Sequence, residues 1–311
     1  MAATSIRERP LLICLAFVQF TNVMDFMIMM PLSPLFTEEF GITPKQFSFL
    51  VASYNISAGV VSLASAFFID RFDRRKVMLF SYAFFVLGTF ACGLSPTYGI
   101  LLAARILTGM FGGVLSAVLL SIVGDAIPYE RRASAMGIVM GGFAAASVLG
   151  VPIGSYVATH FGWHVSFFGI GAMGILVMIG IVKLLPTMNG HIAEALKRNP
   201  LRNMLEIVSS SNRLRALLLM TLLMLGHFSI ISFMPNYMVY NVGITKEQVS
   251  LIYLAGGLCS LVILRVVGKL SDKYGSFRVF ASLSVLSLIP IFAITNLPKE
   301  TLAVVLCVTS T

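Results

Sequence analysis

Two oppositely charged side chains, Asp25 and Arg105, stand inside long apolar stretches of this 311-residue chain. A charged group inside a hydrocarbon layer is costly, so such residues pair with one another or serve a function. Burial disfavours a charged carboxylate, whereas a neighbouring guanidinium favours it. An Asp25–Arg105 pair could therefore hold a carboxyl group that takes up and releases a proton. A static ion pair and a charge that binds a solute directly are the alternatives.

Polar side chains accompany Asp25 along the same stretch. Gln19, Asn22 and Asp25 follow one another at intervals of three residues, which places them on one helical face that should meet water or solute. Apolar neighbours would add adaptable contacts, although Met and Phe are ordinary in membrane helices. Further polar residues at similar depth complete a predicted cavity. Its candidate residues are Gln19, Asn22, Phe26, Met29, Tyr54, Asn55, Asn236 and Tyr237.

The elements that must position these residues are predicted from composition. Charged residues make up 11% of the chain and hydrophobic residues 58%, with a mean hydropathy of +0.92. Runs of about twenty apolar residues are long enough to cross about 30 Å of hydrocarbon as helices. The sequence therefore predicts an all-α polytopic membrane protein. Its spans are expected at 11–35, 47–69, 77–95, 99–123, 134–158, 164–185, 214–238, 247–270 and 277–297, with a tenth that begins at Thr301.

The positive charge of the chain, +9 with 22 Lys and Arg residues, is unevenly distributed. Lys45, Lys246 and Lys299 fall on one side of the predicted spans and Arg105 lies inside a span. All the others fall at the termini and loops of the other side. Because basic loops stay in the cytoplasm, we expect a cytoplasmic N-terminus and a multi-pass protein of the cell (inner) membrane. The basic excess thus reflects topology, and no nucleic-acid partner is expected.

The chain contains an internal repeat with an offset of 202 residues. A charged stretch around Asp70 has a second copy around Asp272, and two Gly-Ile-Thr triplets begin at Gly41 and Gly243. Several matches in one register indicate a duplication. The expected organisation is an N-terminal six-helix bundle, a cytoplasmic central loop and an incomplete second bundle with helices seven to nine and the start of ten. Their boundaries are 1–185, 186–213 and 214–311.

The same offset aligns His227 with Asp25. This makes His227 a third candidate for proton coupling, because an ionisable residue within a span is a functional candidate by default. A structural role for a lone histidine is the alternative.

Two helical bundles joined by a basic loop resemble the major facilitator superfamily. The first charged stretch is similar to the family's loop between helices two and three, except that Ala66 and Asp73 replace its glycines. In the family a carboxylate at the end of helix four engages this loop, which implies a pair between Asp125 and either Arg74 or Arg71. The residues implied in gating or structure by this resemblance are Asp70, Arg71, Arg74, Asp125, Gly268 and Asp272.

The fifth predicted span carries Gly150, Pro152 and Gly154, which resemble the antiporter motif of the family's drug and sugar efflux branch. Pro152 is expected to kink the helix because it lacks an N–H group. Small residues also recur every four positions from 142 to 158, and such stripes let helices approach closely in lipid. Packing alone explains the stripe, and the resemblance adds a seal between the two bundles.

The resemblance implies a secondary active transporter that exports drugs or small metabolites in exchange for protons by alternating access. Its expected partners are a small-molecule substrate, protons and the lipid bilayer, and it is expected to be a monomer. The alternatives are a proton symporter or uniporter for a nutrient, and an inactive, C-terminally truncated transporter fold, since about nine and a half of the family's twelve spans are expected. We expect no enzyme, cofactor or metal site, because no P-loop, zinc-ligand spacing or nucleophile elbow occurs.

Overall fold

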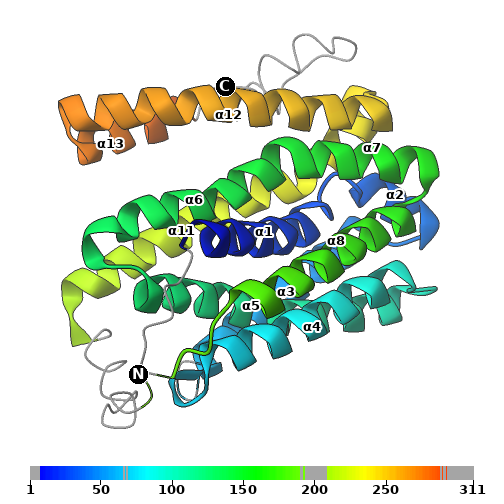
Figure 1. Cartoon of the computed structure of the whole chain (residues 1–311). Helices are drawn as coiled ribbons and strands as arrows, with labels where there is room; N and C mark the ends of the chain where they lie inside the picture. The colour runs from blue at the N-terminus through cyan, green and yellow to red at the C-terminus, as the bar shows by residue number, and fades with distance from the viewer. Residues whose placement is uncertain are drawn as a thin grey trace.

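The computed structural model describes residues 8–189 except 66 and 68, and residues 209–287, together with 192, 289 and 292. The regular elements in these residues are helices that run side by side (Figure 1). Short 3₁₀ turns lie at Ile69–Arg71 and Tyr129–Arg131, and π-helical turns at Ala146–Gly150 and Met238–Val242. The α-helices are α1 (Glu8–Met27), α2 (Ser33–Glu39), α3 (Pro44–Ser65), α4 (Arg74–Gly93), α5 (Tyr98–Ala126), α6 (Arg132–Ala145), α7 (Val151–Phe161), α8 (Trp163–Leu184), α11 (Ser211–Tyr237), α12 (Lys246–Tyr274) and α13 (Ser276–Leu286).

Six stretches of the described residues are long and apolar enough to cross a membrane. They are α1, α3, α4, α5, the continuous stretch Ser134–Phe161 and α8. The first six predicted spans are therefore present, and the protein is a multi-pass membrane protein. We call the end of the bundle that carries Arg74, Arg131 and Lys183 the basic end. The other end, where α2 lies, is the opposite end (Figure 1).

The first span is interrupted, so the prediction of one continuous helix over 11–35 was wrong. α1 ends at Met27, and α2 begins at Ser33 after a turn. Pro31 has no N–H to donate to the carbonyl of Met27, which stops the helical ladder. Pro34 lies in the first turn of α2, where a proline is tolerated.

The fifth span is distorted before its proline. The π-helical turn Ala146–Gly150 directly precedes α7, whose second residue is Pro152. The small residues of this span pack on α1: a side chain at Gly142 would collide with the carbonyl oxygen of Ala16, and a Cβ at Gly154 would lie 2.6 Å from Ile28 Cδ1. The stripe thus serves packing within one bundle. α7 also contacts α12, which lies along it (Figure 1).

The predicted repeat is visible at two helix corners. Gly41 and Gly243 both have positive φ, +58° and +85°, a conformation that glycine adopts without strain. The backbone N–H of Thr43 donates to Gln46 Oε1 at 2.9 Å, and that of Thr245 donates to the Oε1 of the next glutamine, Gln248, at 3.0 Å. In both copies the glutamine N–H donates back to the threonine hydroxyl at 3.3 Å. These are matching capping boxes.

The second charged stretch differs from its first copy. A loop was expected around residue 272, but α12 continues to Tyr274 and turns at Gly275, where φ is +89°. The backbone of Gly268 and Asp272 is therefore helical, and the side chain of Asp272 lies outside the described residues. Most of the predicted central loop, the second half of the ninth span and the whole tenth lie outside them too.

Candidate functional site

Asp25 and Arg105 meet in the interior of the N-terminal bundle. Asp25 Oδ2 lies 2.6 Å from Arg105 Nη1, and both side chains are 0% exposed. The same nitrogen donates to the backbone carbonyl of Asp25 at 3.3 Å. Asp25 is about 26 Å along α1 from the basic end, and Arg105 about 10 Å along α5 from the opposite end. Folding thus brings together two candidates that are 80 residues apart in sequence.

Two further helices complete the surroundings of this pair. Thr89 of α4 donates from Oγ1 to Asp25 Oδ1 at 2.9 Å, so each carboxylate oxygen has its own partner. From α3, the ring of Tyr54 lies over the guanidinium of Arg105, with Cζ 4.4 Å from the ring centroid. The electron-rich face of an aromatic ring attracts a cation. Four helices therefore converge on one carboxylate and one guanidinium.

A second layer of hydrogen bonds holds Tyr54 in place. Its hydroxyl donates to Asn22 Oδ1 at 2.9 Å, and Asn22 Nδ2 donates to Ser116 Oγ at 3.1 Å and to the carbonyl of Gly112 at 3.4 Å. Asn22 and Tyr54, both predicted to line the cavity, are buried in this structure. Their place is in the support of the ion pair.

Two nitrogens of the Arg105 guanidinium do not donate a hydrogen bond to any described residue. They are Nε and Nη2, and both are buried. A buried donor of a charged group without an acceptor is costly. The three N–H groups on these two nitrogens are the ones that a carbonyl or an anion would meet if it reached the pair.

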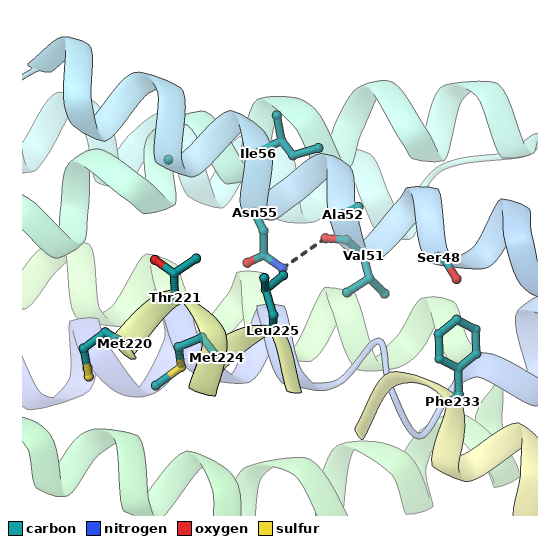
Figure 2. Close-up of a pocket in the computed structure, with 11 residues that line it drawn as sticks. Ser48, Val51, Ala52, Asn55, Ile56, Met220, Thr221, Met224, Leu225 and Phe233 are labelled. Carbon is teal, nitrogen blue, oxygen red and sulfur yellow. Dashed lines mark hydrogen bonds between the residues drawn. The ribbon is translucent and has the colours of Figure 1, made fainter. Parts of the chain in front are cut away.

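A pocket of about 790 Å³ opens between α3 and α11 (Figure 2). Figure 2 shows Asn55 opposite Thr221, Met224 and Leu225, with the Asn55 Nδ2 hydrogen bond to the Val51 carbonyl at 3.4 Å drawn as a dashed line. A pocket of this size suits a drug-sized molecule. Its lining residues are Ser48, Val51, Ala52, Asn55, Ile56, Gly59, Met220, Thr221, Met224, Leu225 and Phe233.

Of the eight candidates for the cavity lining, Asn55 alone is among the described residues that line this pocket. The ring of Phe26 packs on that of Tyr54, with the centroids 5.4 Å apart. Met29 is fully buried in the apolar core, and Gln19 is partly exposed on α1. His227 belongs to α11, and its side chain lies outside the described residues.

Asn236 and Tyr237 lie where the two bundles meet at the opposite end. Asn236 Nδ2 donates to Ser33 Oγ at 2.5 Å. Nearby, the hydroxyls of Thr37 and Tyr240 are 3.3 Å apart. Tyr237 packs against the small apolar cluster that contains Met238 and Val242. The first of these contacts joins α2 to α11, so Asn236 connects the bundles instead of lining the pocket.

The charged corner at the basic end is centred on Arg74. Its Nη2 lies 2.7 Å from Asp70 Oδ1, and its Nε lies 3.2 Å from Asp125 Oδ2. Of the two partners expected for Asp125, the structure therefore uses Arg74, whereas Arg71 is exposed. The arginine side chain is 6% exposed and links the start of α4 to the end of α5.

Asp73, which replaces a glycine of the family pattern, accepts two backbone hydrogen bonds at this corner. Its Oδ1 accepts hydrogen bonds from the backbone N–H groups of Arg75 at 2.9 Å and Met188 at 3.1 Å. The first bond caps the N-terminus of α4. The second ties this corner to the chain that leaves α8.

Sequence reasoning missed Thr89 and Thr221. Threonine is common in membrane helices and often bonds only to its own helix, so its type gave no signal. Thr89 lies beside Asp25 because of the rotation of α4 about its axis. This rotation could not be predicted from the sequence alone. Among the described residues, no three His, Cys, Asp or Glu side chains are grouped so that they could hold a metal ion.

Comparison with known proteins identifies the relatives of this chain. The sequence profile of the Major Facilitator Superfamily matches residues 15–311. Three proteins of Bacillus subtilis (strain 168), each described as an uncharacterized MFS-type transporter, are similar to it. YceJ is 25% identical over 269 residues, covering 85% of this chain and 67% of the relative. YtbD is 28% identical over 269 residues (85% and 66%), and YbcL is 31% identical over 204 residues (65% and 51%). The chain thus spans between half and two thirds of the length of these relatives.

Solved structures share the arrangement of helices. A bacterial homologue of the human lysosomal transporter Spinster, in an inward-facing and occupied conformation, matches with a TM-score of 0.73 at 18% identity, covering 99% of this chain and 72% of that one. A D-xylose–proton symporter matches with a TM-score of 0.69 at 13% identity, covering 99% and 79%. At these identities the likeness shows the fold alone.

Proposed function

This chain belongs to the Major Facilitator Superfamily, and we propose that it acts as a proton-coupled exporter of drugs or small metabolites that works by alternating access. Members of this family are membrane transporters for small molecules. Our proposal adds three points to this family membership: the direction of transport (export), the coupling to protons and the class of substrate. The proposal also places the basic end in the cytoplasm, the protein in the cell (inner) membrane, and one chain in each functional unit.

The buried Asp25–Arg105 pair carries the proposal. A carboxylate and a guanidinium at 0% exposure, 2.6 Å apart, inside membrane-spanning helices are costly to maintain for stability alone. Proton uptake by Asp25 removes its negative charge and leaves Arg105 without a counter-charge. The four helices around the pair would then favour a different arrangement, which couples protonation to a conformational change.

The pocket between α3 and α11 supports a lipophilic, uncharged substrate. Its described lining contains no Asp, Glu, Lys or Arg side chain. Asn55, Thr221 and Ser48 supply a few polar groups, as is usual in sites for small molecules. Asn55 faces this pocket, and its chain neighbour Tyr54 covers Arg105, so α3 connects the substrate site with the ion pair.

The charged corner is proposed as a lock at the basic end. Arg74 contacts both Asp70, in the turn before α4, and Asp125, at the end of α5. All three residues belong to the N-terminal bundle, so the lock would act by holding the start of α4 against the end of α5 while the bundles open or close. Gly150, Pro152 and Gly154 are proposed to support the same movement, because the π-helical turn beside them marks a deformable point in the span.

The test is a transport assay in liposomes that contain a pH-sensitive dye. A substrate from a panel of uncharged, drug-sized antibiotics is added outside. An antiporter exchanges entering substrate for protons and makes the lumen alkaline, irrespective of protein orientation. Asp25→Asn should reduce this signal to background, at least tenfold, whereas Glu39→Gln, which alters an exposed carboxylate, should not.

Two outcomes would refute the proposal. An undiminished signal in Asp25→Asn would show that this carboxyl group does not couple protons. Acidification of the lumen would indicate symport instead, the alternative that the fold shared with the D-xylose–proton symporter keeps open.

A further inference from the structure

Thr89 has two acceptors for one hydroxyl proton. Its Oγ1 lies 2.9 Å from Asp25 Oδ1 and 3.1 Å from the carbonyl oxygen of Phe85, one turn earlier in α4. A hydroxyl carries one hydrogen and two lone pairs. It can therefore donate to only one of these acceptors at a time and accept a hydrogen bond meanwhile. Thr89 is 0% exposed, so water cannot replace either partner from the surface.

The two acceptors suit the two protonation states of Asp25. With the carboxylate ionised, the Thr89 hydroxyl donates to Oδ1 and Arg105 donates to Oδ2. With a proton on Oδ1, that new O–H donates to Thr89 Oγ1, and the Thr89 hydroxyl turns to the carbonyl of Phe85. Oδ2 remains an acceptor for Arg105 in both states. Only the hydroxyl hydrogen has to rotate.

The other titratable or charged side chains near Asp25 cannot serve as hydrogen-bond partner to both of its protonation states. The titratable and charged groups that face it are Arg105 from α5, Tyr54 from α3 and Cys92 from α4. Arg105 can only donate. The hydroxyl of Tyr54 is engaged with Asn22, and the thiol of Cys92 lies 3.7 Å from the Thr108 hydroxyl.

We infer that Thr89 is a positioning residue that directs the proton to Oδ1 of Asp25 and provides a hydrogen-bond partner for both protonation states. This inference rests on the proposed function, in which Asp25 is the group that exchanges the proton. It adds a residue to the site that sequence patterns did not indicate. No atom other than the proton and the hydroxyl hydrogen changes place in this step.

The experiment measures protonation directly and needs no substrate. Infrared spectra of the purified chain in lipid are recorded over a pH series, and the C=O band of protonated Asp25 is identified by its loss in Asp25→Asn. In Thr89→Val the ionised state loses a charge-assisted hydrogen bond, which is stronger than the neutral bond lost by the protonated state. The midpoint should therefore move to higher pH by about one unit. The band should also move to higher frequency, because the protonated carboxyl no longer donates.

Two further variants separate this role from a packing effect. Thr89→Ser keeps the hydroxyl and should restore both the midpoint and the band position. Thr108→Val removes another fully buried threonine hydroxyl, one that bonds to the Ala104 carbonyl and to Cys92 but not to Asp25. It should leave both readouts as in the unmodified protein.

Failure of this inference is distinguishable from failure of the proposed function. An Asp25 band that titrates identically in the unmodified protein and in Thr89→Val would overturn the role of Thr89 and leave proton exchange at Asp25 intact. An equal shift in Thr108→Val would overturn it as well. If no pH gives an Asp25-dependent band in the unmodified protein, both the coupling role of Asp25 and that of Thr89 are refuted.

Discussion

At the scale of single residues, the Asp25–Arg105 pair shows why a buried ion pair points to function. Two charges taken out of water lose hydration that their attraction recovers only in part, so a well-packed apolar pair is often as stable. Here both carboxylate oxygens are bonded, yet two guanidinium nitrogens lack a partner among the described residues. The arrangement is therefore poorly suited to stability alone and well suited to a site whose charge changes.

A double-mutant cycle on this pair gives a stability prediction. Asp25→Leu or Arg105→Met alone should lower the free energy of unfolding by about 3–5 kcal/mol, because each leaves the other charge buried and unpaired. The double variant should cost less than either single change. Thermal unfolding in detergent measures these differences. A double variant that costs the sum of the two single changes would contradict the interpretation.

The exposed pair between Glu8 and Arg131 provides the control. Its atoms are 2.8 Å apart, but the side chains are 33% and 59% exposed. Removing either partner should change the free energy of unfolding by at most about 1 kcal/mol, since water screens the pair.

Sequence reasoning reached the charged residues of the site but not the residue that positions them. Asp25 and Arg105 could be singled out because ionisable groups are rare in apolar spans. Asn22 and Tyr54 were recognised as polar neighbours, but their mutual hydrogen bond depends on the packing of α1 against α3. Thr89 gave no signal, since its importance arises from its distance to Asp25.

At the scale of helices, α6 packs on α1 through a position that admits no side chain. A methyl group at Gly142 would collide with the carbonyl oxygen of Ala16, whereas one at Gly141 would meet nothing within 4 Å. Gly142→Ala should therefore lower stability by about 1–3 kcal/mol through overpacking. Gly141→Ala, its neighbour and matched control, should be neutral or stabilising by up to about 1 kcal/mol, because alanine favours a helix over glycine.

Thermal unfolding of the two purified variants, side by side, measures this difference. Equal stability of the two alanine variants would mean that α6 and α1 can separate at no cost. That outcome would remove the packing explanation of the small-residue stripe.

Helix boundaries were predicted correctly where apolar composition alone marked the helix. They were missed where composition or charge indicated one boundary and a proline or glycine set another. The apolar stretches fixed the second to sixth spans to within four residues at either end. The break between α1 and α2 was missed because apolar composition runs unbroken through Pro31 and Pro34. The extension of α12 through the second charged stretch was missed because charge suggested a loop, whereas Gly275 provides the turn.

At the scale of the whole molecule, the bundles are joined at the opposite end. Asn236 and Ser33 are bonded there, and Thr37 and Tyr240 lie beside them. Toward the basic end, residues 212–226 of α11 are exposed along their length. If transport proceeds by alternating access, the contacts at the opposite end must break in every cycle.

Cross-linking tests this requirement. Ser33→Cys combined with Asn236→Cys should form a disulfide on oxidation, because the two side chains touch in the structure. Transport should then fall to background and return when a reductant is added. Each single variant treated with the same oxidant should keep its activity. The variants are made in a protein whose native cysteines are replaced, namely Cys14, Cys92, Cys259 and Cys307.

Full activity of the cross-linked protein would show that the opposite end stays closed during transport. Alternating access would then be excluded for this molecule.

The overall organisation was the most predictable level, since composition, charge asymmetry and the repeat all pointed to the same fold. The contacts between bundles were not predictable, because they depend on how the helices of one bundle pack against those of the other. Asn236 illustrates this: its polarity suggested a cavity, and its position placed it against Ser33.

The paired capping boxes at Thr43 and Thr245 have a consequence for how the protein is made. Each box uses bonds between residues only three apart, so it can close as soon as its own segment has emerged from the ribosome. Neither corner has to wait for the other half to be synthesised. The two reversals are therefore local features, and each can form from its own segment without the other.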